Sequence, residues 1–187
     1  MNKTAASLRE AIETAGLRDG MTVSFHHHLR SGDYVINAVM NEIAAMGIKN
    51  LTVNASSLFD VHAPLAEHIK NGVITKIITD YMSAGLGEYI SGGIMEQPVD
   101  FMTHGGRPTA IMQGKTPIDV AFVAAPAADK EGNCTGKTGR SACGSLGYAF
   151  ADAEYAKKTV VITDGLCEKL EEPSIDGKFV DIVVCMD

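Results

Sequence analysis

The stretch "MTVSFHHHLRSGDYVINAVMNEIAAMG", residues 21–47, decides the fold because it joins a strand pattern to a helix pattern through a polar loop. The segment Met21–Phe25 has the short apolar run of a β-strand. Apolar residues then recur with the 3.6-residue period of a helix, at Val35, Val39, Ile43 and Met46. Asp33 is expected to cap the start of this helix and Gly47 its end. A strand, a loop and a helix in this order predict one unit of a parallel α/β sheet.

The same alternation continues along the chain. Further strands are predicted at Asn50–Ala55, Val73–Met82, Val99–Arg107 (ending in a glycine turn), Ile118–Asp129, Thr159–Asp164 and Phe179–Met186. Further helices are predicted at 7–16, 64–72, 85–93 (short and broken) and 147–158. Repeated strand–helix units need right-handed crossovers. The predicted fold class is therefore α/β, with an open, mainly parallel sheet and helices on both faces. Residues 1–187 are expected to form a single domain.

Composition and charge restrict the function. The 187 residues are 45% hydrophobic and 21% charged, with a formal net charge of −7, which disfavours a broad nucleic-acid-binding face. No apolar run approaches the roughly 20 residues of a membrane span. The amino terminus has the Ser7–Glu10 capping box of an amphipathic helix, and not the pattern of a signal peptide. We therefore expect a cytoplasmic protein without nucleic-acid or membrane partners.

Ligands of open α/β sheets bind beyond the carboxyl ends of the strands, and this rule selects four loops. They are the loop from His26 through His27, His28 and Arg30, the loop that begins at Asn54, the loop His104-Gly105-Gly106-Arg107, and the glycine-rich segment 127–147. Two of these loops combine histidine with arginine. The glycine-rich segment supplies unhindered backbone N–H groups, which suit an anion.

The three consecutive histidines allow three interpretations. A metal site is one, but adjacent side chains of a strand point to opposite faces, so only His26 and His28 can converge. No Asp, Glu or Cys completes a familiar zinc spacing, and none of the four cysteines forms a CxxC pair, so no metal is expected. A second interpretation is packing and backbone hydrogen bonding. A third is a binding loop for a polycarboxylate or a phosphate, with Arg30 beside a helix amino terminus.

The segment from His104 to Arg107 and the glycine-rich segment each have two interpretations. Gly105 and Gly106 allow a ligand to approach the backbone closely, and Arg107 can pair with a carboxylate through two hydrogen bonds. The alternative is a plain turn with a solvated arginine. The glycine-rich segment lacks the spacing of a nucleotide loop, so it is either an anion-binding loop or a flexible connector.

The segment "DGMTVSFHHHLRSGDYVINAVM" resembles the alpha subunit of citrate lyase, the citrate CoA-transferase component. The likeness continues through "SGGIMEQPVDFMTHGGRPTAIMQGKTPIDVAFVAAPAADKEGNCTG" and covers nearly the whole chain, and the "SFHHHLRSGDYV" and "HGGR" blocks are its most specific parts. Members of that family are much longer. The resemblance therefore implies a fold of the CoA-transferase type and the amino-terminal half of a two-domain subunit.

The resemblance also implies an activity. An acetyl-carrier thioester and citrate give a citryl-carrier thioester and acetate, and the thiol belongs to a CoA-like phosphopantetheine arm on an acyl carrier subunit. The implied partners are the beta (lyase) and gamma (acyl carrier) subunits, the carboxyl-terminal half of the alpha subunit and further copies in a homo-oligomer. No metal is implied.

The chemistry of the loops agrees with this activity. Citrate carries three carboxylates, and the donors expected to bind it are His26, His27, His28, Arg30, Asn54, His104, Gly105, Gly106 and Arg107. Gly132, Asn133, Gly136 and Gly144 are expected to contact the carrier. The sequence contains no evident activated nucleophile, so the catalytic residues stay unknown.

Two rival functions fit the same fold. A sugar-phosphate isomerase or a sugar-phosphate-binding domain would use the glycine-rich segment for the phosphate. A non-catalytic scaffold half would only complete a partner, and its loops would be structural.

Overall fold

The structure is a computed structural model and describes residues 2–26 and 34–186. Within these residues a large sheet runs in the order β1-β11-β9-β6-β2-β3-β4-β5, and every neighbouring pair is parallel. Its strands are β1 (Thr4–Ala5), β2 (Thr22–His26), β3 (Leu51–Ala55), β4 (Ile74–Thr79), β5 (Asp100–Phe101), β6 (Val120–Ala124), β9 (Lys158–Thr163) and β11 (Ile182–Cys185). The predicted parallel α/β sheet is confirmed.

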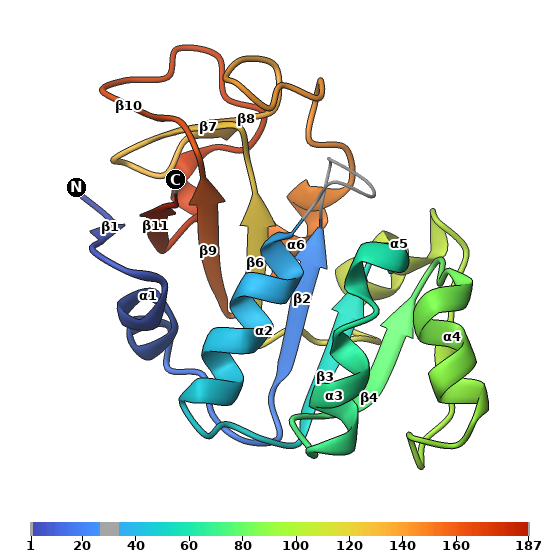
Figure 1. Ribbon diagram of the computed structural model, residues 1–187. Helices are drawn as coiled ribbons and strands as arrows, with labels where there is room; N and C mark the ends of the chain where they lie inside the picture. The colour runs from blue at the N-terminus through green and yellow to red at the C-terminus, as the bar shows by residue number, and fades with distance from the viewer. Residues whose placement is uncertain (1, 27–33, 187) are drawn as a thin grey trace.

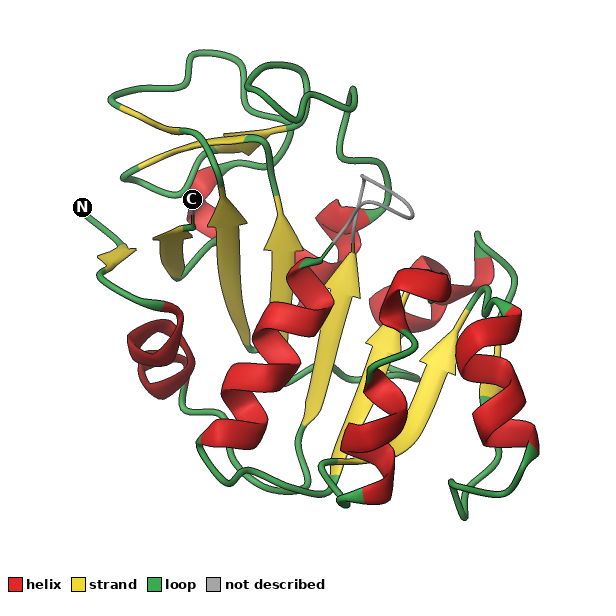
Figure 2. Ribbon diagram, viewed as in Figure 1, coloured by secondary structure: helices red, strands yellow, loops and turns green. Residues whose placement is uncertain are grey.

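Helices cover both faces of this sheet (Figures 1 and 2). The α-helices are α1 (Leu8–Ala15), α2 (Val35–Ala45), α3 (Leu65–Lys70), α4 (Ala84–Ser91), α5 (Gly106–Met112) and α6 (Ala149–Tyr155). Helices α1 to α4 lie on the front face in Figure 1, and α5 and α6 lie behind it. The described part of the chain also contains the 3₁₀ turns η2 (Asp60–His62) and η3 (Gly177–Phe179). No helix of the described residues is long and apolar enough to cross a membrane.

Each face has its own core. The front core joins the buried side chains of α1 to α4 to residues of the strands, with Phe25 stacked on Phe122 at a ring-centroid distance of 5.5 Å. The rear core joins α6 to β6, β9 and β11 through residues such as Val123 and Val161. A strand buried on both faces is the expected arrangement of a parallel sheet.

Helix α1 shows how closely a local signal can specify an element. The Ser7 side chain accepts a hydrogen bond from the backbone N–H of Glu10, as the capping box predicted. Gly16 ends the helix with φ = 71°, a left-handed conformation that glycine adopts without steric cost.

The segment Val99–Arg107 is not the strand ending in a glycine turn that we predicted. Only Asp100–Phe101 is extended, and Gly106 starts helix α5. The N-cap residue is Gly105, and Thr103 supports the first turn, because its carbonyl accepts hydrogen bonds from the N–H groups of Gly106 and Arg107. The two consecutive glycines suggested a turn, but they begin a helix.

The glycine-rich segment also differs from its prediction as a loop. The predicted strand Ile118–Asp129 breaks into β6 and β7 (Ala127–Asp129), on either side of Pro126. Strand β7 then forms a small sheet with the antiparallel β8 (Cys134–Thr135) and the parallel β10 (Leu166–Cys167). This small sheet lies above the carboxyl ends of the large one in Figure 1, so the segment is a structured cover at that edge.

Candidate functional site

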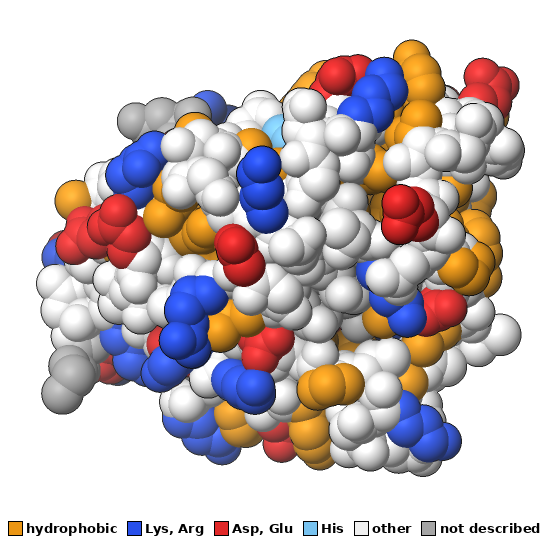
Figure 3. All heavy atoms as spheres, turned by 90° about the horizontal axis from the view of Figure 1, so that it is seen from below, with side chains coloured by type: hydrophobic (Ala, Val, Ile, Leu, Met, Phe, Trp, Pro, Cys, Tyr) orange, Lys and Arg blue, Asp and Glu red, His pale blue; other side chains and the backbone are white. Residues whose placement is uncertain are grey.

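The strand order reverses at β2, which makes the carboxyl end of that strand the topological switch point of the sheet. From β2 the chain proceeds through β3, β4 and β5 toward one edge, whereas β6, β9 and β11 lie on the other side. Ligands of open α/β sheets bind at such a point. The amino ends, seen from below in Figure 3, carry interspersed basic and acidic side chains, including the ion pairs Lys157–Asp119 and Lys158–Asp181. The candidate site is therefore the carboxyl edge.

A buried ion pair lies behind this edge, on the rear face of the sheet. Arg107 on α5 and Asp152 on α6 are both fully buried, and the guanidinium meets the carboxylate through two hydrogen bonds, Nη1–Oδ2 at 3.0 Å and Nη2–Oδ1 at 2.5 Å. Burial raises the pKa of the Asp152 carboxyl, but the charge and hydrogen bonds of Arg107, together with His26, hold it well below its usual range. The pair is thus charged on both sides and joins two helices.

Asn54 completes the coordination of the guanidinium. Its side-chain Oδ1 accepts a hydrogen bond from Arg107 Nε at 2.7 Å, and its backbone carbonyl accepts one from Nη2 at 3.1 Å. Ser24 and Asn54 are register partners on β2 and β3, and their side chains and that of His26 share the rear face because side chains alternate along a strand. The strands therefore direct one polar row toward α5 and α6.

His26 is the last residue of β2 and is only 8% exposed. Its Nδ1 lies 3.7 Å from Asp152 Oδ2, which is within the range of an ion pair and beyond that of a hydrogen bond. The structure therefore brings together three of the predicted site residues, His26, Asn54 and Arg107, around a carboxylate that the sequence analysis did not select.

A second carboxylate–histidine pair lies at the carboxyl end of β4. Asp80 follows this strand, and its Oδ2 lies 2.9 Å from His104 Nδ1. The His104 side chain is 68% exposed, whereas that of Asp80 is 5% exposed. The ring of Tyr148 meets the His104 ring edge-on, at a centroid distance of 5.1 Å. Burial raises the pKa of Asp80 above its ordinary value, although His104, Arg107 and His26 all act to lower it.

The two predicted glycines after His104 differ in their surroundings. The N–H of Gly106 donates to Thr103, and a Cβ on Gly106 would lie 2.7 Å from Thr103 Oγ1. A Cβ on Gly105 would have no neighbour within 4 Å. Close packing therefore favours glycine at position 106, while Gly105 faces open space at the edge.

The predicted carrier-binding residues lie in or beside the small sheet. The amide of Asn133 is used internally, donating to Asp129 and accepting from the backbone of Gly177. A Cβ on Gly132 would meet Val180 at 2.9 Å, and one on Gly136 would meet the Gly144 carbonyl at 2.3 Å, so these glycines pack against the protein's own chain. Gly144, with φ = 95°, has open space around it. The carrier contacts of all four residues stay a prediction.

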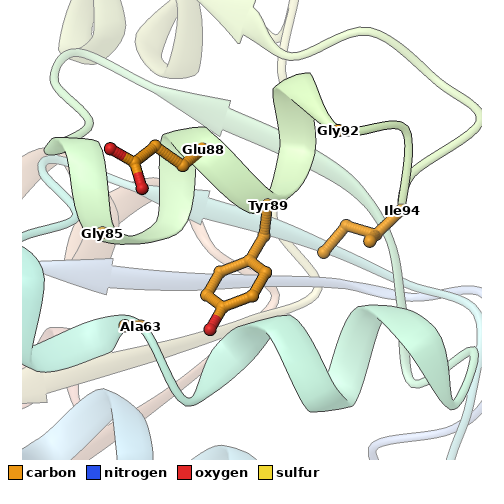
Figure 4. Close-up of a pocket in the computed structure, with 6 residues that line it drawn as sticks. All are labelled: Ala63, Gly85, Glu88, Tyr89, Gly92 and Ile94. Carbon is orange, nitrogen blue, oxygen red and sulfur yellow. The ribbon is translucent and has the colours of Figure 1, made fainter.

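His27, His28 and Arg30 lie outside the described residues, as does the predicted helix cap Asp33. Within the described residues there is no group of three or more His, Cys, Asp or Glu side chains that could hold a metal ion. Figure 4 shows a shallow hollow on the front face, lined by Ala63, Gly85, Glu88, Tyr89, Gly92 and Ile94. It contains none of the predicted site residues.

Three side chains of this edge were not predicted from the sequence, namely Asp80, Tyr148 and Asp152. Asp80 could have been predicted, because it directly follows the end of strand β4. The four loops of the sequence analysis were chosen because they occupy the same position after a strand. Asp152 carried a weaker signal, since it is a lone carboxylate on the buried, alanine-rich face of α6. Only the tertiary structure shows that Asp152 lies opposite Arg107.

Comparisons with known proteins identify relatives across the whole chain. The model of the family described as citrate lyase, alpha subunit (CitF), matches residues 1–187. The citrate lyase alpha chain of Haemophilus influenzae is 52% identical over 183 residues, which are 97% of this chain and 37% of that protein. The corresponding protein of Escherichia coli is 50% identical over 186 residues, or 99% of this chain and 36% of its own length. The chain thus spans little more than a third of these curated relatives.

Solved structures agree with this relationship. A crystal structure of a citrate lyase alpha subunit from Streptococcus mutans, in complex with citrate, superimposes with a TM-score of 0.98 at 49% identity; it covers all of this chain and 37% of the other. Glutaconate coenzyme A-transferase from Acidaminococcus fermentans superimposes with a TM-score of 0.71 at 17% identity, over 98% of this chain and 75% of the other. The second likeness shows a shared CoA-transferase-like fold.

Proposed function

The chain belongs to the citrate lyase alpha subunit family, and from this premise we propose that it is the citrate-binding part of an acyl-carrier transferase. The reaction exchanges the acyl group of a thioester: an acetyl-carrier thioester and citrate give a citryl-carrier thioester and acetate. The carrier thiol belongs to a CoA-like phosphopantetheine arm on an acyl carrier subunit. The beta and gamma subunits and the remainder of the alpha subunit are the proposed partners, and the cytoplasm is the proposed location.

The observation that carries the proposal is the arrangement of the carboxyl edge, together with a relative of nearly identical fold whose structure is described as a citrate complex. His104 is exposed at that edge and is held by a buried carboxylate. In its charged form, an imidazole placed in this way can donate a hydrogen bond from Nε2 to a substrate carboxylate. Gly105 leaves room beside it.

The other predicted residues take different parts in this proposal. His27, His28 and Arg30 are proposed as further ligands of the three citrate carboxylates. Arg107 has Asp152 and Asn54 as partners and is fully buried, which favours a positioning role over direct contact with citrate. His26 and Asn54 share that network at the rear of the site. We assign no nucleophile, and we propose that the thioester reacts where this chain meets the rest of the subunit.

Citrate binding is tested by thermal unfolding and calorimetry. Citrate at about a hundred times its Kd should stabilise the chain by about 2.7 kcal/mol, which is a rise in Tm of roughly 5–10 °C for a domain of this size. His104→Gln should weaken binding about tenfold or more, because a hydrogen bond to a charged group is lost. The matched control is His68→Gln on α3, where the histidine contacts Asn41 and lies outside the site.

Three outcomes would contradict the proposal. If citrate, acetyl-CoA and the acyl carrier all leave the Tm unchanged, binding by this chain fails. If ribose 5-phosphate stabilises the chain and citrate does not, the sugar-phosphate function is the better one. If the full-length subunit converts the acetyl-carrier thioester and citrate into the citryl-carrier thioester and acetate, and keeps this activity after substitution of all the predicted histidines and arginines, the loops are only a scaffold.

A further inference from the structure

We propose that Asp80 is a positioning residue for His104, which fixes the imidazole so that Nε2 is presented to a hydroxy-acid substrate at the carboxyl edge. The identity of the ligand rests on the proposed function, whereas the state of the ring can be measured without any ligand.

The hydrogen-bond geometry assigns the roles of the two ring nitrogens. Asp80 Oδ2 lies 2.9 Å from His104 Nδ1, and an ionised carboxylate can only accept a hydrogen bond. Nδ1 therefore carries a proton in the neutral and the charged ring alike. In the neutral ring this leaves Nε2 as an acceptor, and in the charged ring it makes Nε2 a second donor. Both forms offer Nε2 to a ligand.

Burial raises the pKa of Asp80, and Arg107, His104 and His26 act against that rise. His104 does so through the hydrogen bond of its Nδ1 with Asp80. Arg107 therefore interacts with both carboxylates of the edge, through hydrogen bonds with Asp152 and through space with Asp80. The buried ion pair and the exposed histidine are thereby linked.

One further contact restricts where the His104 ring lies. Tyr148 meets it edge-on from the segment before α6, so the ring lies between a carboxylate and an aromatic neighbour.

Asp80 Oδ1 and Asn54 Nδ2 are buried polar atoms without a hydrogen-bond partner among the described residues. An acceptor and a donor of this kind suit a ligand that carries both a hydroxyl and carboxylates.

The test combines ring ¹⁵N NMR with citrate affinity. His104 signals are assigned by their loss in His104→Gln, and the wild-type ring should be in the Nδ1–H tautomer at high pH. Asp80→Ala removes the acceptor and should shift the ring toward Nε2–H, with roughly tenfold weaker citrate binding. In the full-length subunit the KM for citrate should rise more than kcat falls. Asp80→Asn keeps an acceptor oxygen and should retain the tautomer, with a smaller loss of affinity.

The matched control is Asp100→Ala on β5, which removes an exposed partner of Lys76 and should change neither tautomer nor affinity. A wild-type ring in the Nε2–H tautomer, or one unchanged in Asp80→Ala, overturns the positioning role. If Asp80→Ala does not fold, an Nε2–H tautomer in Asp80→Asn overturns it instead, because that variant keeps the acceptor oxygen. Absence of citrate binding by wild type contradicts the proposed function alone, since the tautomer is measured without citrate.

Discussion

Among the described residues of the carboxyl edge, two carboxylate–histidine pairs differ in whether the histidine is exposed. In the pair His26–Asp152 both side chains are buried, the two atoms are 3.7 Å apart, and the carboxylate belongs primarily to Arg107. In the pair His104–Asp80 the atoms are 2.9 Å apart and the histidine is exposed to solvent. The same two residue types thus build a structural support in one place and, in the other, an exposed imidazole that we propose contacts the ligand. The two pairs also differ in the part that a third residue, Arg107, takes. Arg107 donates hydrogen bonds to Asp152, whereas it acts on Asp80 through its charge.

The largest expected effect comes from removing that third residue. Arg107→Ala leaves Asp152 as a buried charge without its main partner, and it should lower the free energy of unfolding by about 3–5 kcal/mol. Urea denaturation measures this loss. Arg9→Ala is the matched control, because Arg9 pairs with Glu42 at the surface and should contribute less than about 1 kcal/mol. Equal losses in the two variants would mean that the buried pair does not support the edge.

A third histidine, His62, extends the comparison, because its Nδ1 pairs with a backbone N–H group instead of a carboxylate. His62 in η2 is fully buried, and its Nδ1 accepts a hydrogen bond from the N–H of Phe59 at 3.0 Å. Burial lowers the pKa of His62 from 6.5 to about 4. Between these two values the unfolded chain is protonated while the folded protein is not, so stability falls as the pH is lowered from 6.5 toward 4.

The loss should reach up to about 3 kcal/mol at pH 4, and denaturation midpoints at pH 7, 6 and 5 would follow its onset. His62→Asn keeps an acceptor near the position of Nδ1 and has no charge to gain. The variant should therefore show a flatter dependence on pH in this window. An equally steep dependence in the variant would assign the effect to other groups.

The smallest expected effect belongs to the exposed pair. His104→Ala should lower the free energy of unfolding by no more than about 1 kcal/mol, because its ring is largely solvated and water can replace it beside the buried Asp80 carboxylate. The same denaturation experiment measures it beside Arg107→Ala. A loss of several kcal/mol would show that His104 is a structural residue like His26, and the contrast between the two pairs would disappear.

The sequence predicted those parts of the molecule that depend on local patterns. Alternating apolar strands and amphipathic helices gave the parallel sheet, and Ser7, Glu10 and Gly16 gave the limits of α1. Helix α5 was missed because two glycines have low helix propensity. Thr103 accepts a hydrogen bond from Gly106 at the start of this helix, a contact that the glycine pattern did not suggest. The small sheet was missed because two- and three-residue strands have no detectable period.

The candidate site also has a part that local patterns predicted and a part that they did not. The rule of carboxyl ends correctly gathered His26, Asn54, His104 and Arg107 at one edge. It could not show that Arg107 is paired internally, because Asp152 lies 45 positions further along the chain and its helical neighbours are alanines. Long-range partners of this kind are set by tertiary packing, which no local pattern encodes.

The pairing of β1 with β11 has a consequence for the order of folding. Thr4 is the register partner of Val183, and Lys3 donates to the carbonyls of Gly177 and Val180. During synthesis this first strand therefore cannot dock until the segment from Gly177 to Val184 has been made. Such distant pairings slow folding, so β1 should join the sheet late.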